Sequence, residues 1–369
     1  PAGYGEVPFY WWIGDTLTRE HLAWQLDMLA RKRISSLQIN YCHTDTGGIT
    51  YGRTFRSKPD LFTPAWWELF GWFMTEAGKR GMTVSLSDYT LGVGQGSYVV
   101  ENPWPRALVA EVKAERRLPS LDPMHPRAGH SYVRHFFQRF ADRFPGESET
   151  GLNFFFSDEL NFNLQGNIWN DIFRDEFMRR KGYDILPQID ALFVDLGDSS
   201  VKVRMDYNDV RVALSEENFF IPVYEWHQRR GLLFGCDHGG RGRDVGEFGD
   251  YFRTQRWNQA PGCDQPMLQK DIIKNKVASS ISHLYERQRV WREGFHSSEW
   301  STNSAQLTDA IFTNFAMGQN LLSLHGLYYT TMGGWWEWAA PCNHFHEPYW
   351  DEMDGLLECT ERLSYILSQ

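Results

Sequence analysis

Short apolar runs alternate along this chain with longer amphipathic segments, which is the pattern of a parallel α/β fold. Eight of the short runs are predicted strands: Pro8–Ile13, Ile34–Tyr41, Met82–Asp88, Leu152–Phe156, Leu232–Cys236, Pro261–Asp264, Arg289–Phe295 and Leu321–Tyr328. The segments with helical spacing are predicted helices: Thr18–Arg33, Pro64–Arg80, His130–Phe144, Asp171–Lys181, Asp206–Arg230, Lys270–Gln288, Leu307–Gly318 and Trp350–Leu367. Eight strands alternating with helices predict a (β/α)8 barrel, the TIM barrel, with long rim loops.

Local signals support these boundaries. Thr18 is suited to cap the first helix, Pro64 stands in the first turn of the second, and Gly81 and Gly182 follow helix ends. The stretch from Thr90 to Arg127 shows no regular period and is predicted to be a rim loop. No linker interrupts the pattern, so residues 1–369 are expected to form one barrel domain, either a barrel-only protein or a piece of a larger multidomain protein.

Composition narrows the classes of function. The net charge of −10 argues against nucleic acid, and no apolar run is long enough to predict a membrane span. The five cysteines are widely spaced without a CxxC pair, which argues against a cysteine zinc site and leaves the compartment open. Phosphate-binding, dinucleotide-binding and GxSxG motifs are missing from the sequence, so no organic cofactor is expected.

Aromatic residues are unusually frequent, with 16 Trp, 16 Tyr and 25 Phe. Clusters such as Trp11-Trp12 and Trp335-Trp336-Glu337-Trp338 cannot all point into a core. Aromatic faces stack on the C–H faces of sugar rings, which suggests a carbohydrate ligand. The aromatic residues expected to contact substrate are Trp12, Trp300, Tyr328 and Trp335.

The active site of such a barrel lies at the carboxyl ends of the strands, so the polar residues there are the candidates. From the third strand to the eighth these residues are Asp88, Asp158, Glu159, Asp237, His238, Asp264, Glu293 and His325. Acids gathered at one barrel mouth repel one another, and such a cost usually has a catalytic or metal-binding reason.

Glycoside hydrolysis needs two carboxyl groups, one to protonate the leaving oxygen and one to activate water or attack the sugar. Glu159 and Glu293, on the fourth and seventh strands, are the predicted pair. The apolar run Phe154–Phe156 before Glu159 suits a general acid, because an apolar wall raises a carboxyl pKa. The alternatives are a solvated capping turn at Glu159 and a surface salt bridge at Glu293; Glu299 is a rival acid that we interpret as a first-turn helix residue.

Other polar clusters have open interpretations. Asp237 and His238 could hold sugar hydroxyls or a divalent ion, or form a structural turn. The segment from Cys342 to Glu347 has the composition of a metal site but is interpreted as a substrate-contacting rim. Asp15 and Asp45, near strand ends, add oxygen ligands for a hard cation such as calcium.

An ordered series of segments resembles glycoside hydrolase family 106, a family of α-L-rhamnosidases. The series comprises Trp12–Leu29, Gly81–Asp88, Ser157–Glu159, Phe177, Lys181–Asp184, Pro261–Asp264, Lys276–His283, Arg289–Phe295, Trp300, Gly318–Asn320, His325 and Tyr328–Tyr329. The resemblance implies an inverting mechanism with Glu159 as general acid and Glu293 as general base. It also implies a calcium ion near the sugar and an extracellular or periplasmic location.

The leading hypothesis is therefore an exo-acting glycosidase that releases α-L-rhamnose or a similar deoxy or neutral sugar from an oligosaccharide or glycoside. A second hypothesis is a carbohydrate-binding barrel without catalysis. A third is a metal-dependent sugar isomerase or lyase that uses Asp237, His238, Asp264 and His325. The sugar, the linkage and the oligomeric state do not follow from the sequence.

Overall fold

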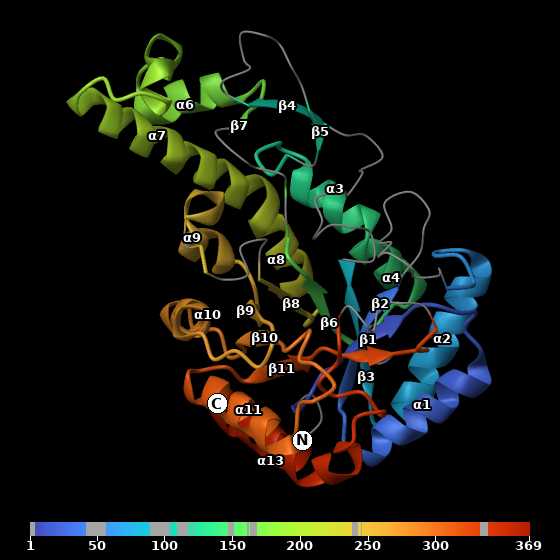
Figure 1. The fold of residues 1–369 in the computed structure, drawn as a ribbon. Helices are drawn as coiled ribbons and strands as arrows, with labels where there is room; N and C mark the ends of the chain where they lie inside the picture. Colours follow the sequence, from blue (N-terminus) through green and yellow to red (C-terminus); the bar gives the residue numbers. More distant parts are fainter. Residues whose placement is uncertain are drawn as a thin grey trace.

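A barrel of parallel strands lies in the lower half of the molecule (Figure 1). The computed structural model describes residues 4–41, 57–88, 104–108, 118–120, 122–146, 151–160, 162, 168–237, 243–244, 246–332 and 339–369. Within these ranges the barrel strands are β1 (Phe9–Trp12), β2 (Ser36–Tyr41), β3 (Thr83–Ser87), β6 (Leu152–Ser157), β8 (Leu233–Cys236), β9 (Ala260–Gln265), β10 (Trp291–Gly294), β11 (Leu321–Leu324) and β12 (Leu327–Tyr328). They agree with all of the predicted strand positions.

The sheet closes through its last strand. β11 and β12 are the two halves of the predicted eighth strand; β11 pairs with β10, and β12 pairs with β1 on the other side. A further bridge joins Glu6 to Leu322. All of the pairings in this sheet are parallel. The predicted TIM barrel is confirmed, and it brings the carboxyl ends of the strands to one mouth.

The helices around the barrel follow the predicted pattern, except that the short α9 was not predicted. They are α1 (Arg19–Arg31), α2 (Pro64–Lys79), α3 (Ala128–His135), α4 (Phe137–Arg143), α8 (Ile221–Gln228), α9 (Tyr251–Gln255), α10 (Ile272–Leu284), α11 (Ser304–Ala316) and α13 (Asp354–Leu367). Thr18 caps α1 by accepting the N–H of His21, as its position in the sequence predicts. None of the helices in the described ranges has the length and apolar character needed to cross a lipid bilayer.

Two predicted helices differ from the structure. The segment His130–Phe144 forms two helices, α3 and α4, because Phe136 leaves helical geometry with φ −117° and ψ −76°. The segment Asp206–Arg230 belongs to a longer run that begins with α7 (Asp198–Ser215) and passes through a π-helical turn, η4 (Glu216–Phe220), into α8. The apolar residues in the first turns of α7, Val201, Val203 and Met205, are spaced by two rather than at helical intervals, so they gave no signal by which to place its start.

A second set of elements projects away from the barrel, at the top of Figure 1. It contains a three-stranded antiparallel sheet, made of β4 (Trp104–Leu108), β5 (Leu118–Ser120) and β7 (Ile168–Trp169), together with α6 (Phe173–Lys181), the 3-10 helix η3 (Leu186–Leu192) and α7. A separate apolar cluster that includes Phe173, Phe177 and Tyr207 supports it. The expectation of a plain rim loop from Thr90 to Arg127 is therefore wrong at β4 and β5. The single-domain prediction for residues 1–369 stays a prediction.

The barrel strands separate two apolar layers. Phe9 and Trp11 of β1 point inward and pack with Trp291 of β10. Tyr10 and Trp12 of the same strand belong to the larger cluster between the sheet and the helices. Side chains alternate along a strand, so of two consecutive residues near a carboxyl end only the one that points inward can reach the mouth.

Candidate active site

Four carboxylic acids from four neighbouring strands meet at the barrel mouth. Asp158 follows β6, Asp237 follows β8, Asp264 lies on β9 and Glu293 lies on β10, directly paired with Asp264. The four side chains are at most 6% exposed. Carboxylate oxygens of Asp158, Asp237 and Glu293 lie within 4.8 Å of one another, and Glu293 also belongs to a second group with Asp264 and His296 at the same limit. Glu293 is thus common to both groups.

The crowding changes how these acids hold protons. Burial, and then the charges of Asp158, Asp264 and Asp237, raise the pKa of Glu293 well above its usual value. Burial raises the pKa of Asp237 in the same way, with further contributions from Asp158, Asp264 and Glu159. Without a cation the cluster therefore holds its protons to a higher pH than free carboxylic acids do, and a bound cation would favour the ionised forms.

Glu159 is anchored to this cluster through its main chain. Its N–H donates to Oδ1 of Asp237 at 2.7 Å, and its φ of 50° lies in the left-handed region that non-glycine residues rarely adopt. The side chain is half-buried, in contrast to the buried acids beside it. Phe155 and Phe156 precede it as buried residues of β6, while the side chain of Phe154 is outside the described part. The turn therefore leaves Glu159 accessible at the mouth.

His325 completes the mouth on the side of β11 and β1. Nε1 of Trp11 donates to Nε2 of His325 at 3.0 Å, which leaves the proton of the neutral ring on Nδ1. Burial, and then the neighbouring charge of His296, lower the pKa of His325 to about 3. The ring is therefore a neutral donor at physiological pH. Trp11 was not among the contacts predicted from the sequence.

Trp12 does not reach the mouth, so its prediction as a substrate contact is wrong. It is fully buried on the outer face of β1, where its ring lies 4.9 Å from that of Phe73 in α2. The sequence offered two consecutive tryptophans, and the pleat sends them to opposite faces. Trp11 replaces Trp12 as the aromatic residue of β1 at the site.

The remaining predicted contacts have varied positions. Asp88, directly after β3, is fully buried, and burial raises its pKa. Tyr328 is 1% exposed and donates its hydroxyl to the carbonyl of Ala339 at 2.7 Å. Trp300 is half-buried on the loop after β10. His238 and Trp335 lie outside the described residues. Substrate contact by these residues stays a prediction.

The alternative interpretation of Glu293 does not match its burial. Glu293 is 4% exposed, Arg289 is 8% exposed and Arg292 is fully buried, so the three residues do not form a surface salt bridge. Glu299 is exposed.

The segment from Cys342 to Glu347 makes a buried rim. His344 is 1% exposed and Glu347 is 3% exposed. Within the described part of the chain, neither they nor His346 belongs to a group with metal-ligand spacing. Asp15 is exposed and outside the acid cluster, and Asp45 is outside the described residues.

A family model described as alpha-L-rhamnosidase, that of glycoside hydrolase family 106, matches residues 119–334, more than half of the chain. The chain belongs to glycoside hydrolase family 106. No curated protein matches it in sequence.

Solved structures agree with the fold of this family 106 chain. The rhamnosidase from Novosphingobium sp. PP1Y superposes with a TM-score of 0.69 at 10% identity, over 100% of this chain and 60% of that one. The catalytic domain of β-amylase from Paenibacillus polymyxa superposes with a TM-score of 0.50 at 10% identity, over 86% of this chain and 92% of that one. At such identities the likeness shows the fold alone. The chain spans 60% of the length of the rhamnosidase that it matches.

The acid cluster fits a hard cation by the chemistry of its donors. The group of Asp158, Asp237 and Glu293 supplies only carboxylate oxygens, the ligands that Ca²⁺ prefers. Oδ2 of Asp237 is buried and has no hydrogen-bond partner among the described residues. The second group includes the imidazole of His296, a donor that suits transition metals better. The all-oxygen group is thus the better match for calcium.

Proposed function

We propose that this family 106 chain carries the active site of an exo-acting, inverting α-L-rhamnosidase, with Glu159 as general acid and Glu293 as general base. One observation carries the proposal: both residues are tied to Asp237. The main chain of Glu159 donates to its carboxylate, and Glu293 lies within 4.8 Å of it. A shared anchor holds two carboxyl groups at one barrel mouth, which is the arrangement that glycoside hydrolysis requires.

The two environments suit the two roles. Glu159 is half-buried at the end of an apolar strand and is accessible to a leaving oxygen. Glu293 is 4% exposed, surrounded by acids, and must be ionised to accept a proton from water. We propose that Asp158, Asp237 and Glu293 hold Ca²⁺, which when bound supplies positive charge that keeps their carboxylates ionised. The chain's own Asp237 then orients both catalytic residues.

The test is hydrolysis of aryl α-L-rhamnosides by Glu159→Gln and Glu293→Gln, with Glu299→Gln as the matched control. Each of the first two changes should lower turnover by about 10²–10⁴-fold, the usual contribution of a general acid or base. The control should retain activity because Glu299 is exposed. Full activity in either of the first two variants would refute the assignment.

Leaving-group dependence separates the acid from the base. A dinitrophenyl leaving group needs no proton, so Glu159→Gln should regain most of its activity on that substrate. Glu293→Gln should not regain it, but added azide should restore turnover by replacing the activated water. The opposite pattern would exchange the two roles.

The product identifies the reaction. Proton NMR of the first anomer released should show inversion at the anomeric carbon. In heavy-oxygen water the label should enter the released sugar, whereas an isomerase or lyase would add none by hydrolysis. Saturable sugar binding without turnover on any glycoside would favour a carbohydrate-binding barrel instead. We also propose an extracellular or periplasmic location, in keeping with a glycoside or oligosaccharide substrate.

A further inference from the structure

Helix α9 is five residues long, yet its buried side holds the end of β8. The hydroxyl of Tyr251 donates to the carbonyl oxygen of Asp237 at 2.7 Å. Nε2 of Gln255 donates to the carbonyl oxygen of Cys236 at 2.8 Å and to the hydroxyl of Tyr251 at 3.1 Å. Both side chains are fully buried. Side chains of α9 thus bond the carbonyl groups at the end of β8 and just beyond it.

The strand pairing explains why α9 is needed there. On one side β8 pairs with β9 only as far as Cys236 opposite Pro261, and proline has no N–H to donate. On the other side the pairing with β6 ends at Ser157 opposite Cys236. Asp237 is therefore just beyond the sheet. Its main-chain direction depends on groups outside the ladder.

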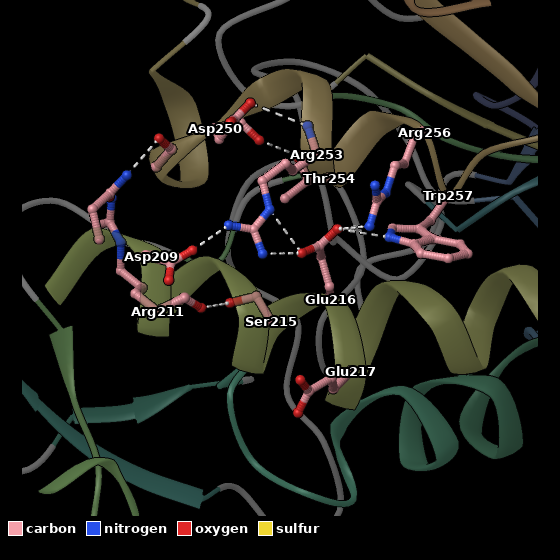
Figure 2. Close-up of polar contacts among 12 residues, drawn as sticks. Asp209, Arg211, Ser215, Glu216, Glu217, Asp250, Arg253, Thr254, Arg256 and Trp257 are labelled. Carbon is pink, nitrogen blue, oxygen red and sulfur yellow. Dashed lines mark hydrogen bonds and ion pairs between the residues drawn. The ribbon is translucent and has the colours of Figure 1, made fainter. Parts of the chain in front are cut away.

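The other side of α9 is fixed by ion pairs to the buried carboxylate of Glu216. Figure 2 shows Glu216 between Arg253 on one side and Arg256 with Trp257 on the other. Oε2 of Glu216 accepts from Nε of Arg253 at 2.9 Å, and Oε1 accepts from Arg256 at 2.8 Å and from Trp257 at 3.0 Å. The Glu216 side chain is 5% exposed. Charge-assisted bonds to a buried carboxylate are strong and have a fixed geometry.

Glu216 also lies at the junction of two helices. It is the first residue of the π-helical turn between α7, which carries the projecting elements, and α8, which packs on the barrel. Arg253 contacts α7 as well, through Asp209 at 2.7 Å. Since π-helical turns interrupt regular helices at a cost, they are often kept for a functional reason. Here the turn places an acid against α9.

We propose that Tyr251 is a positioning residue for Asp237, and that Glu216 and Arg253 act through it by fixing α9 to the junction of α7 and α8. The catalytic consequence rests on the proposed function, because Asp237 anchors Glu159 and Glu293. That Tyr251 positions Asp237 can be tested without assuming the proposed function. The N–H of Glu159 bonds Oδ1 of Asp237, so this amide reports directly where Asp237 lies.

The experiment compares Tyr251→Phe with Tyr207→Phe. Tyr207 is a matched control, since its buried hydroxyl donates to the carbonyl of Ile168 at 2.6 Å in the projecting part. Hydrogen exchange of the Glu159 amide, followed by mass spectrometry, should become about tenfold faster in Tyr251→Phe and stay unchanged in Tyr207→Phe. Equal exchange in the two variants would overturn the proposal.

Kinetics supply the second measurement. In Tyr251→Phe and Glu216→Gln, kcat on an aryl rhamnoside should fall about tenfold with little change in KM, because orientation rather than binding is lost. Arg253→Lys, which keeps the charge, should retain more activity than Arg253→Met. If Tyr251→Phe fails to fold, the exchange test is made on Arg253→Lys and Arg253→Met. A wild-type chain that hydrolyses no rhamnoside would refute the proposed function, while the Glu159 exchange rate would still decide the positioning.

Discussion

Glu293→Gln should both stop the enzyme and stabilise its metal-free form. The change removes one negative charge from a group in which the carboxylates of Asp158, Asp237 and Glu293 lie within 4.8 Å of one another. It keeps the shape of the side chain, and the amide can still donate the hydrogen bond that Glu293 makes to Asp158. Packing is therefore conserved, and the effect on stability comes from charge.

The size of the effect follows from the separation. Two unit charges 4.8 Å apart repel by about 3.5 kcal/mol at an effective dielectric constant of about 20. The native cluster avoids part of this repulsion by binding protons, so the expected gain in the free energy of unfolding is about 3 kcal/mol. For a chain of 369 residues the entropy of unfolding is about 0.8 kcal/mol/K, which converts the gain to a rise in Tm of about 4 °C.

The gain in stability from Glu293→Gln should increase as pH rises. The pKa of Glu293 is raised in the folded chain, so above its usual value near 4.5 the folded state binds more protons than the unfolded state. Stability of the metal-free wild type therefore falls as pH rises above about 4.5, and the raised pKa of Asp237 adds to the fall. Glu293→Gln should show a shallower fall and should converge with the wild type below about pH 4.

Differential scanning calorimetry in EDTA between pH 4 and 8 is the assay, with Glu299→Gln as the control. The control should leave Tm unchanged, because Glu299 is exposed. In excess Ca²⁺ the advantage of Glu293→Gln should shrink or reverse, because a ligand has been lost. A lower Tm in EDTA, or an equal gain at pH 4 and pH 8, would refute the electrostatic argument.

Three further perturbations test other parts of the site. Ca²⁺ at about 100 times its Kd should stabilise the EDTA-treated protein by about 2.7 kcal/mol, seen as a rise in Tm of about 3–4 °C; no shift would exclude a calcium site. Trp11→Phe removes the donor to His325 and should cost about 1 kcal/mol and lower kcat/KM; unchanged kinetics would separate His325 from the reaction. Gly262→Ala places a Cβ 2.2 Å from Cε3 of Trp291 and should destabilise by about 1–3 kcal/mol in urea, whereas Gly78→Ala meets nothing within 4 Å and should not.

The barrel could be predicted because its signals are local and repeated. Each strand has its own apolar run, and residues such as Thr18 and Gly182 mark helix ends with chemistry that needs no tertiary context. The projecting part lacks such signals. β7 is only two residues long, and β4 and β5 lie in a stretch without a regular period. Their pairing depends on distant contacts that the sequence does not reveal.

The sequence indicated which strands carry the site residues, but not which face of a strand each residue occupies. Asp158, Asp237, Asp264 and Glu293 were placed from strand ends alone, because parallel strands bring those ends together. The choice of Trp12 over Trp11 failed because a strand buried on both faces shows no apolar alternation to fix its phase. Tyr251 and Glu216 were missed because each acts on a partner far away in sequence.

The charge distribution around the mouth connects these observations. Acids follow or lie on consecutive strands from β3 to β10, from Asp88 to Glu293. On the other side of the ring, β11 and β1 supply His325 and Trp11 instead, and burial holds the pKa of His325 at about 3. An imidazolium there would neutralise part of the negative field that stabilises an oxocarbenium-like transition state. By donating to Nε2, Trp11 also favours the neutral ring, because a protonated ring would have no lone pair to accept the bond. The mouth thus has its carboxylic acids on one side and a neutral donor on the other. This arrangement suits the proposed reaction once a bound cation favours the ionised acids.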